Sequence, residues 1–135
     1  TRSWFERSNA FSVMKDAAAA GHRILLTSDH GSIQCRNPTV IHAKKDASSS
    51  LRYKVGMDLR LDNPETTFLT KVGENLRLPP APLGTSYAIA LDDHYFVYPN
   101  RLREYQRRYR NSFLHGGISP EEMIVPVVEL KSRTG

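Results

Sequence analysis

Asp29 and His30 end the most apolar run of the sequence, ILLTSDHG at positions 24–31. A carboxylate and an imidazole are both good ligands for Zn²⁺, and Gly31 lets the backbone approach a bulky ion or phosphate. In an open α/β sheet, ligands gather beyond the carboxyl ends of the strands, which is where this pair would lie. The structural alternative is that Asp29 caps a turn and His30 is an ordinary loop histidine.

A zinc site needs at least one more protein ligand, because closed and catalytic sites use three or more. The other candidates are His22, His42, His94 and His115. The first lies at the opposite end of the predicted strand, and the next two lie among charged or turn residues, so we expect these three to be solvated. His115 differs, because the two glycines of LHGGIS keep side chains away from its imidazole, as a metal and its phosphate would require.

The pattern around Asp29 is typical of α/β proteins. Apolar residues recur at helical spacing from Ser3 to Ala20, and Gly21 stands where a left-handed C-cap would end a helix. From Arg23 to Thr27 the apolar residues do not alternate with polar ones. This predicts a strand buried on both faces, as in a parallel sheet covered by helices.

Further elements are predicted downstream. Two hairpins are expected, Ser32–Arg36 with Thr39–Ala43 around Asn37-Pro38, and Tyr87–Leu91 with Tyr95–Tyr98 around residues 92–94. Between them we expect a loop at Lys44–Ser50 and an element at Thr67–Lys71. The last elements are a helix from Arg101 to Phe113 capped by Asn100, a brief helix opened by a Ser119 to Glu122 capping box, and a Met123–Leu130 strand in which Pro126 indicates an edge or bulge.

The predicted Arg101–Phe113 helix has two distinct faces. One is an apolar stripe of Leu102, Tyr105, Tyr109 and Phe113. The other carries Arg103, Arg107 and Arg110, which form either a solvated face or a phosphate-binding strip, since Arg binds phosphate bidentately.

Length, charge and cysteine content limit the class of protein. A chain of 135 residues suits one compact domain, and its net charge of +5 favours an anionic partner, either a phosphate-bearing substrate or nucleic acid. The single cysteine, Cys35, cannot form an internal disulfide, and no apolar run approaches the roughly 20 residues that span a bilayer. We therefore expect a reducing, cytoplasmic setting and no membrane insertion.

Two motifs together resemble a known family. TSDHG alone is a weak signal, but paired with SFLHGGISPEEMIVPVV it resembles the PglZ domain of the alkaline phosphatase superfamily, and specifically the output domain of PorX-like response regulators. The resemblance covers essentially the whole chain, including Asn37-Pro38, Leu51–Lys54 and Tyr98-Pro99.

The resemblance implies a fold and a chemistry. The fold would be the C-terminal part of an alkaline-phosphatase-like α/β sandwich, with a central, mostly parallel sheet flanked by helices. Asp29 and His30 would bind the zinc ion that also holds the nucleophile, and His115 would bind a second zinc ion. The implied reaction is hydrolysis of a phosphodiester or phosphomonoester, with an oligonucleotide as one substrate class and Arg103, Arg107 and Arg110 as candidate substrate-binding residues. An upstream receiver domain and a sensor histidine kinase would be partners.

The sequence departs from the family pattern at its start. In the superfamily the Thr or Ser nucleophile and further metal ligands precede the DHG motif, whereas here only one helix and one strand precede Asp29. We therefore expect residues 1–135 to be a single unit, the C-terminal portion of a PglZ domain, inactive by itself and with an exposed strand edge that pairs with a second copy. Two other functions stay open: a nucleic-acid-binding module, whose binding would fall steeply with salt, and a non-catalytic signalling module.

Overall fold

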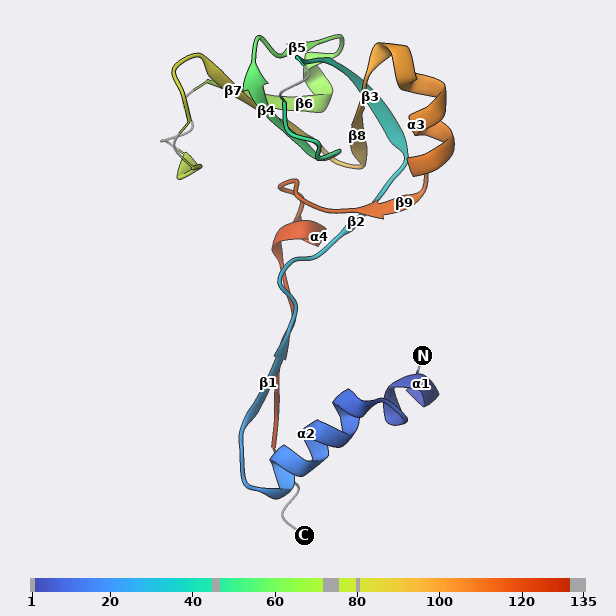
Figure 1. Cartoon of the computed structure of the whole chain (residues 1–135), viewed down its shortest axis with the longest axis vertical. Coiled ribbons are helices and arrows are strands. Elements are labelled where there is room, and N and C mark those ends of the chain that lie inside the picture. The colour runs from blue at the N-terminus through green and yellow to red at the C-terminus, as the bar shows by residue number, and fades with distance from the viewer. Residues whose placement is uncertain (1, 45–46, 72–75, 80, 132–135) are drawn as a thin grey trace. The chain divides into compact units, whose positions relative to one another are not determined.

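The computed structural model describes residues 2–44, 47–71, 76–79 and 81–131. The fold is mixed α/β, with four α-helices and four small sheets in this part of the chain (Figure 1). Contacts divide the described residues into two compact units, 2–29 with 125–131, and 30–124. No helix among the described residues is long and apolar enough to cross a membrane.

The first unit begins with two helices, α1 (Arg2–Glu6) and α2 (Asn9–Ala19). The prediction of helix over Ser3–Ala20 is confirmed except for a break at residues 7–8. Ser8 causes the break, because its side chain accepts a hydrogen bond from the Phe11 N–H at 3.2 Å and so caps α2. Gly21 has a φ of +80°, which confirms the predicted left-handed position after the helix.

A two-stranded antiparallel ribbon completes the first unit. It consists of β1 (Ile24–Thr27) and β10 (Val127–Leu130). The β1 strand is confirmed, but its burial on both faces is wrong, because Leu25 and Leu26 are 64% and 46% exposed. A ribbon of two strands leaves apolar side chains uncovered wherever no helix packs on it. The strand predicted from Met123 begins only at Val127, directly after Pro126.

The second unit contains two three-stranded sheets and a short ribbon. The first sheet has the order β5-β3-β8 (Arg60–Leu61, Asn37–His42, His94–Val97), and the second has the order β4-β7-β6 (Tyr53–Met57, Thr85–Ala90, Thr67–Thr70). The ribbon pairs β2 (Ile33–Cys35) with β9 (Ser112–Leu114). Only β3 and β8 run parallel among these described strands. A central, mostly parallel sheet therefore stays a prediction.

Both predicted hairpins are wrong in their pairing, although their strands exist. β2 pairs with β9, and β3 pairs with β5 and β8, so Asn37-Pro38 lies within β3 and is not a turn. β7 and β8 belong to different sheets, because β7 is the central strand between β4 and β6 and all six of its residues are buried. These strands therefore pair with strands from other parts of the chain, although the short polar segments between them predict hairpin turns. The β6 strand confirms the element predicted at Thr67–Lys71, and the described residues of Lys44–Ser50 form a loop, with residues 45 and 46 outside the described part.

The helix α3 (Leu102–Tyr109) is shorter than predicted. A 3-10 turn (Pro99–Arg101) precedes it, so Asn100 lies in that turn and Arg101 takes the N-cap position. The helix ends before Asn111, whose φ is +64°, and the following residues pair with β2 as β9. Leu102, Tyr105 and Tyr109 pack against the buried cluster of Cys35, Tyr95 and Val97. The fourth residue of the predicted stripe, Phe113, is 70% exposed on β9.

Lys54 is a buried cation in β4 and is only 2% exposed. Its ammonium group donates to the Ser48 carbonyl oxygen at 2.7 Å and lies 5.0 Å from the centre of the Tyr98 ring. Burial lowers the pKa of Lys54 from 10.5 to about 8. A cation held in this way makes the stability of the fold sensitive to pH.

The expected effect concerns alkaline pH. Between the folded pKa of about 8 and the unfolded value of 10.5, the unfolded chain binds a proton that the folded chain has lost, so stability rises with pH. We expect the free energy of unfolding of the wild type, relative to Lys54→Met, to rise by about 1 kcal/mol from pH 8 to pH 9. Urea unfolding at several pH values measures this. A free energy of unfolding that changes equally with pH in the two proteins would contradict it.

Candidate functional site

The imidazole rings of His30 and His115 stack on each other in the second unit. Their ring centres are 3.9 Å apart and their planes differ by 12°. Both residues are exposed, which leaves them accessible to a ligand. The structure therefore brings together two of the three predicted metal ligands, from segments far apart in the sequence.

Asp29, the third predicted ligand, lies after β1 and belongs to the first unit, where it ends the N-terminal segment of that unit. Within the described part of the chain, no group of three or more His, Cys, Asp or Glu side chains is arranged to hold a metal ion. Of the histidines expected to be solvated, His22 is exposed, His42 is exposed and bonds to Asp62 at 2.7 Å, and His94 is partly buried. The predicted role of Asp29 in metal binding stays a prediction.

The tautomer of the neutral His30 ring follows from its hydrogen bond. Nδ1 of His30 lies 2.8 Å from the carbonyl oxygen of Gly31, which can only accept. Nδ1 must therefore carry the hydrogen, and Nε2 carries the lone pair of the neutral ring. Metal-binding histidines are commonly oriented by this kind of bond to a backbone carbonyl.

Three glycines let the segments around the histidines pack closely. A Cβ atom at Gly31 would overlap the carbonyl oxygen of Glu121. Gly116 has a φ of +99°, and a Cβ there would lie 3.2 Å from the Tyr53 ring. At Gly117 a Cβ would lie 2.5 Å from the Glu122 carboxylate and 2.6 Å from the Arg52 guanidinium. Backbone packing therefore requires glycine at position 31, side-chain packing requires it at position 117, and the positive φ favours it at position 116.

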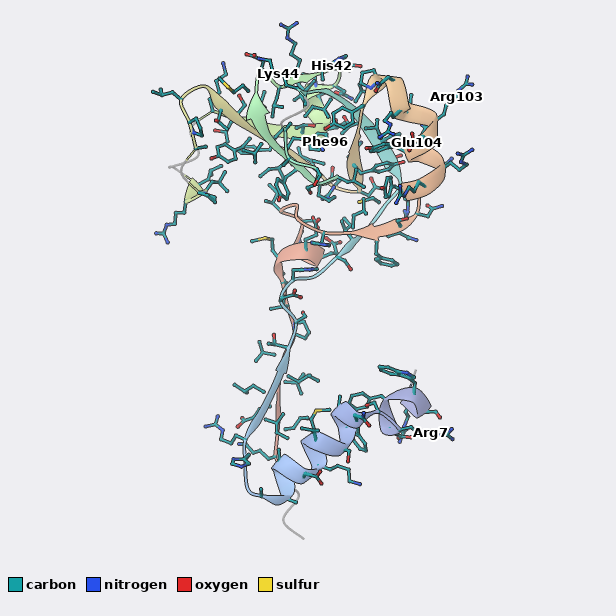
Figure 2. All side chains as sticks on the ribbon, in the orientation of Figure 1. Arg7, His42, Lys44, Phe96, Arg103 and Glu104 are labelled. Carbon is teal, nitrogen blue, oxygen red and sulfur yellow. The ribbon has the colours of Figure 1, made fainter. Side chains whose placement is uncertain are left out.

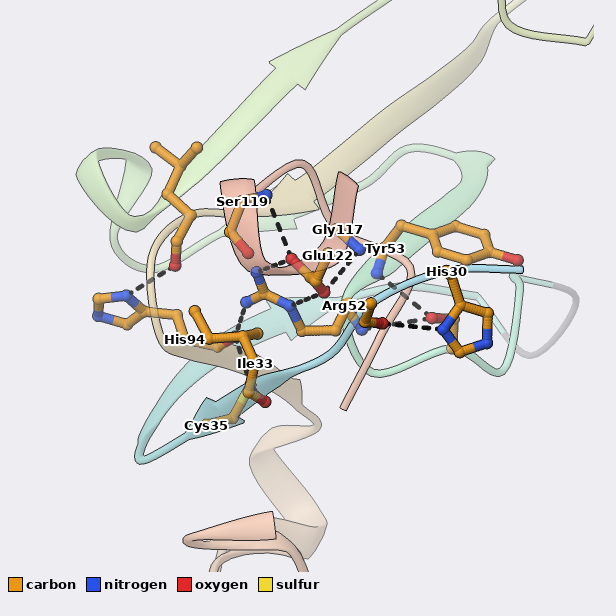
Figure 3. Close-up of polar contacts among 12 residues, drawn as sticks. His30, Ile33, Cys35, Arg52, Tyr53, His94, Gly117, Ser119 and Glu122 are labelled. Carbon is orange, nitrogen blue, oxygen red and sulfur yellow. Dashed lines mark hydrogen bonds and ion pairs between the residues drawn. The ribbon is translucent and has the colours of Figure 1, made fainter. Parts of the chain in front are cut away.

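A buried ion pair between Arg52 and Glu122 lies next to Gly117 (Figure 3). Arg52 donates to both carboxylate oxygens of Glu122, at 2.9 and 2.8 Å, and the two side chains are 0% and 2% exposed. Arg52 also donates to the carbonyl oxygen of His94. The sequence indicated Glu122 through the capping box that opens α4 (Pro120–Met123), which the structure confirms, but it gave no sign that Arg52 is the partner.

The ion pair keeps both groups charged. Burial would raise the pKa of Glu122, but hydrogen bonds from Arg52, Gly117 and Ser119 outweigh it and hold the pKa below its ordinary value. Burial likewise opposes the charge on Arg52, and the Glu122 carboxylate reverses this and raises the Arg52 pKa. At neutral pH both groups are therefore charged, and the two hydrogen bonds between them hold the side chains in one arrangement.

The three candidate substrate-binding arginines lie on or just after α3. Arg103, Arg107 and Arg110 are all exposed, and Figure 2 shows Arg103 projecting from the outer face of the helix. The β9 strand connects this helix to His115. Arg110 and His115 lie on either side of this strand, and at about 3.3 Å per extended residue they are separated by up to about 16 Å along the chain. Their role in substrate binding stays a prediction, and it would need an extended substrate.

A separate cavity of about 720 Å³ lies beside β2, β9 and the start of α4. Among the described residues that line it are Asp92, Asp93 and Glu121 but only one cationic side chain, Arg36. A phosphate group would meet mainly negative charge there. The cavity is therefore less suited to a phosphate ester than the histidine pair is.

These features belong to an alkaline phosphatase-like class of domain. Residues 7–130 match the family described as the BREX system PglZ alkaline phosphatase-like domain, so the chain belongs to the PglZ family. The match includes His30, His115 and the Arg52–Glu122 pair. No curated protein matches the chain.

Proposed function

We propose that this chain carries part of a two-metal site for the hydrolysis of phosphoric esters, with His30 and His115 as metal ligands. The observation that carries the proposal is the stacked histidine pair. Ions bound on the same side of the two stacked rings would lie about one ring spacing apart, and the ring spacing of 3.9 Å suits the separation of about 3.5–4 Å between the ions of two-metal phosphoryl-transfer sites. Parallel rings cannot both aim a lone pair at one ion between them, so each ring would serve its own ion.

The residues present fit zinc in part. Imidazole is a good zinc ligand, His30 is held in one tautomer by the Gly31 carbonyl, and both rings are exposed. When bound, zinc would polarise a phosphoryl oxygen and stabilise charge on the attacking and leaving oxygens. Asp29 is a further donor that the sequence alone predicts, and the stacked histidines carry the proposal without it.

The chain's own residues would orient the phosphate and hold the ligands in place. The glycines beside the two histidines let these segments pack against Glu121, Tyr53 and the Arg52–Glu122 pair, which holds the two rings in place. We further propose that the nucleophile comes from a more N-terminal part of the PglZ domain and that the domain is the output module of a PorX-like response regulator. The paired DHG and HGGIS motifs support both proposals.

Zinc binding by the protein, measured by calorimetry and by metal analysis, tests this function. We expect wild-type protein to bind zinc, and His30→Ala and His115→Ala each to lower the affinity by more than 100-fold, because loss of a mere supporting partner already costs 10–100-fold. His22→Ala is the matched control, since His22 is exposed and lies in the other unit. Wild-type protein that binds no zinc, or equal affinities in all variants, would refute the metal site.

A nucleic-acid-binding module is the second candidate function, and the exposed arginines of α3 favour it. That function predicts binding of an oligonucleotide in the absence of metal, with an affinity that falls steeply as salt increases. Binding that instead requires zinc and both histidines would favour the hydrolase. The two functions are therefore separated by one titration with and without a chelator.

A further inference from the structure

We infer that Glu122, held by Arg52, is the positioning residue that sets His30 and His115 against each other. The predicted effect on metal binding rests on the proposed function, whereas the placement of the two rings by Glu122 does not. Glu122 bonds to the backbone next to the two imidazoles, at Gly31 and at Gly117. It acts through the backbone of the two segments that carry them.

The Glu122 side chain fixes the segment that carries His115. One carboxylate oxygen accepts the Gly117 N–H at 2.9 Å, and the other accepts the Ser119 N–H at 3.2 Å. Gly117 lies two residues beyond His115 and is buried. The backbone that follows the imidazole is therefore tied at two points to one carboxylate.

The Glu122 main chain fixes the segment that carries His30. Its carbonyl oxygen accepts the Gly31 N–H at 2.9 Å. The adjacent carbonyl of Glu121 leaves no room for a side chain at Gly31, so the two backbones lie in direct contact. One residue thus anchors the backbone next to both histidines.

Arg52 makes this anchor rigid. Its guanidinium holds both oxygens of the Glu122 carboxylate and is tied in turn to the His94 carbonyl. The planar fork of Arg fixes the direction of the carboxylate, which a point charge such as Lys would not do. Because the pair is fully buried, water does not compete for these bonds.

The test uses Glu122→Gln, which keeps the shape of the side chain and removes its charge. The amide nitrogen of Gln can only donate, so it faces the Arg52 or backbone N–H groups without a bond. In metal-free protein, NMR should show a nuclear Overhauser effect between the His30 and His115 rings in the wild type and its loss in Glu122→Gln. In zinc titrations the variant should bind 10–100-fold more weakly, as for loss of an outer-shell partner.

A matched control separates positioning from general stability. Ile41→Ala removes a fully buried side chain from the core cluster of Phe96 and Ala88, a cluster that contains no residue of either histidine segment. We expect it to lower stability while keeping the ring-to-ring signal and the zinc affinity. Equal loss of both readouts in this control and in Glu122→Gln would mean that Glu122 only stabilises the fold.

A milder variant guards against failure to fold. Arg52→Lys keeps the charge but cannot hold both carboxylate oxygens and the His94 carbonyl together, so we expect a weakened ring-to-ring signal in a folded protein. A folded Glu122→Gln or Arg52→Lys protein with an unchanged signal would overturn the inference. If the wild type shows the signal but binds no zinc, the proposed function fails while the positioning role stands.

Discussion

Arg52→Met is expected to lower the free energy of unfolding by about 3–5 kcal/mol at pH 7, because it leaves the Glu122 carboxylate buried without its counter-ion. The Arg52 and Glu122 side chains are 0% and 2% exposed, so water cannot replace the lost bonds. The His94 carbonyl loses its donor as well. Urea unfolding followed by circular dichroism measures the change.

The same substitution at an exposed pair is the control. Arg2→Met breaks an ion pair with Glu6 in which the side chains are 91% and 47% exposed, and it should cost less than about 1 kcal/mol. The double variant Arg52→Met/Glu122→Gln should recover part of the loss, because no buried charge is left unpaired. Similar losses of unfolding free energy for Arg52→Met and Arg2→Met would show that the buried ion pair contributes no more to stability than the exposed one.

The Arg52 effect should also depend on pH. The folded pKa of Glu122 lies below its unfolded value of about 4.5, so the contribution of the carboxylate is fully present above pH 4.5 and is lost as pH falls through the folded pKa. The difference in stability between wild type and Arg52→Met should therefore shrink in acid. A difference that grows below pH 4.5 would contradict this sign.

Gly31→Ala is expected to lower the free energy of unfolding by about 3 kcal/mol, the upper end of the usual cost of overpacking. The added Cβ would overlap the Glu121 carbonyl oxygen, which belongs to the backbone and cannot rotate away. Relief of the clash must separate the two segments and lengthen the hydrogen bond from the Gly31 N–H to Glu122. Zinc affinity should fall with it, because His30 is the neighbouring residue.

Gly56→Ala is the matched control in the same unit. A Cβ at Gly56 would lie 3.1 Å from the Ala47 Cβ, a contact that a small shift can relieve. Alanine is also better than glycine within a strand, by roughly 0.5–1 kcal/mol, which offsets part of the crowding. Gly31→Ala as stable as Gly56→Ala would show that the segments at residues 31 and 121 are not in the close contact described.

The sequence by itself determined the family and the local elements. The paired DHG and HGGIS motifs indicated the PglZ domain, and a match over residues 7–130 confirms it. The α2 helix, the β1 and β6 strands and the Ser119 to Glu122 capping box were predicted because each depends on neighbouring residues. Side-chain spacing and capping are short-range effects that a sequence displays directly.

Strand pairing and burial were decided only by the tertiary structure. The residues at the start of β4 show this clearly, because Lys54 and Arg52, which directly precedes the strand, are buried while the aromatic Tyr53 between them is 39% exposed. Hydropathy would place these three residues the other way round. Arg52 is inside because Glu122, far along the chain, neutralises its charge there, and burial of an unpaired charge would be too costly. The stacking of His30 on His115 likewise depends on backbone contacts between distant segments, and those contacts exist only once the chain has folded.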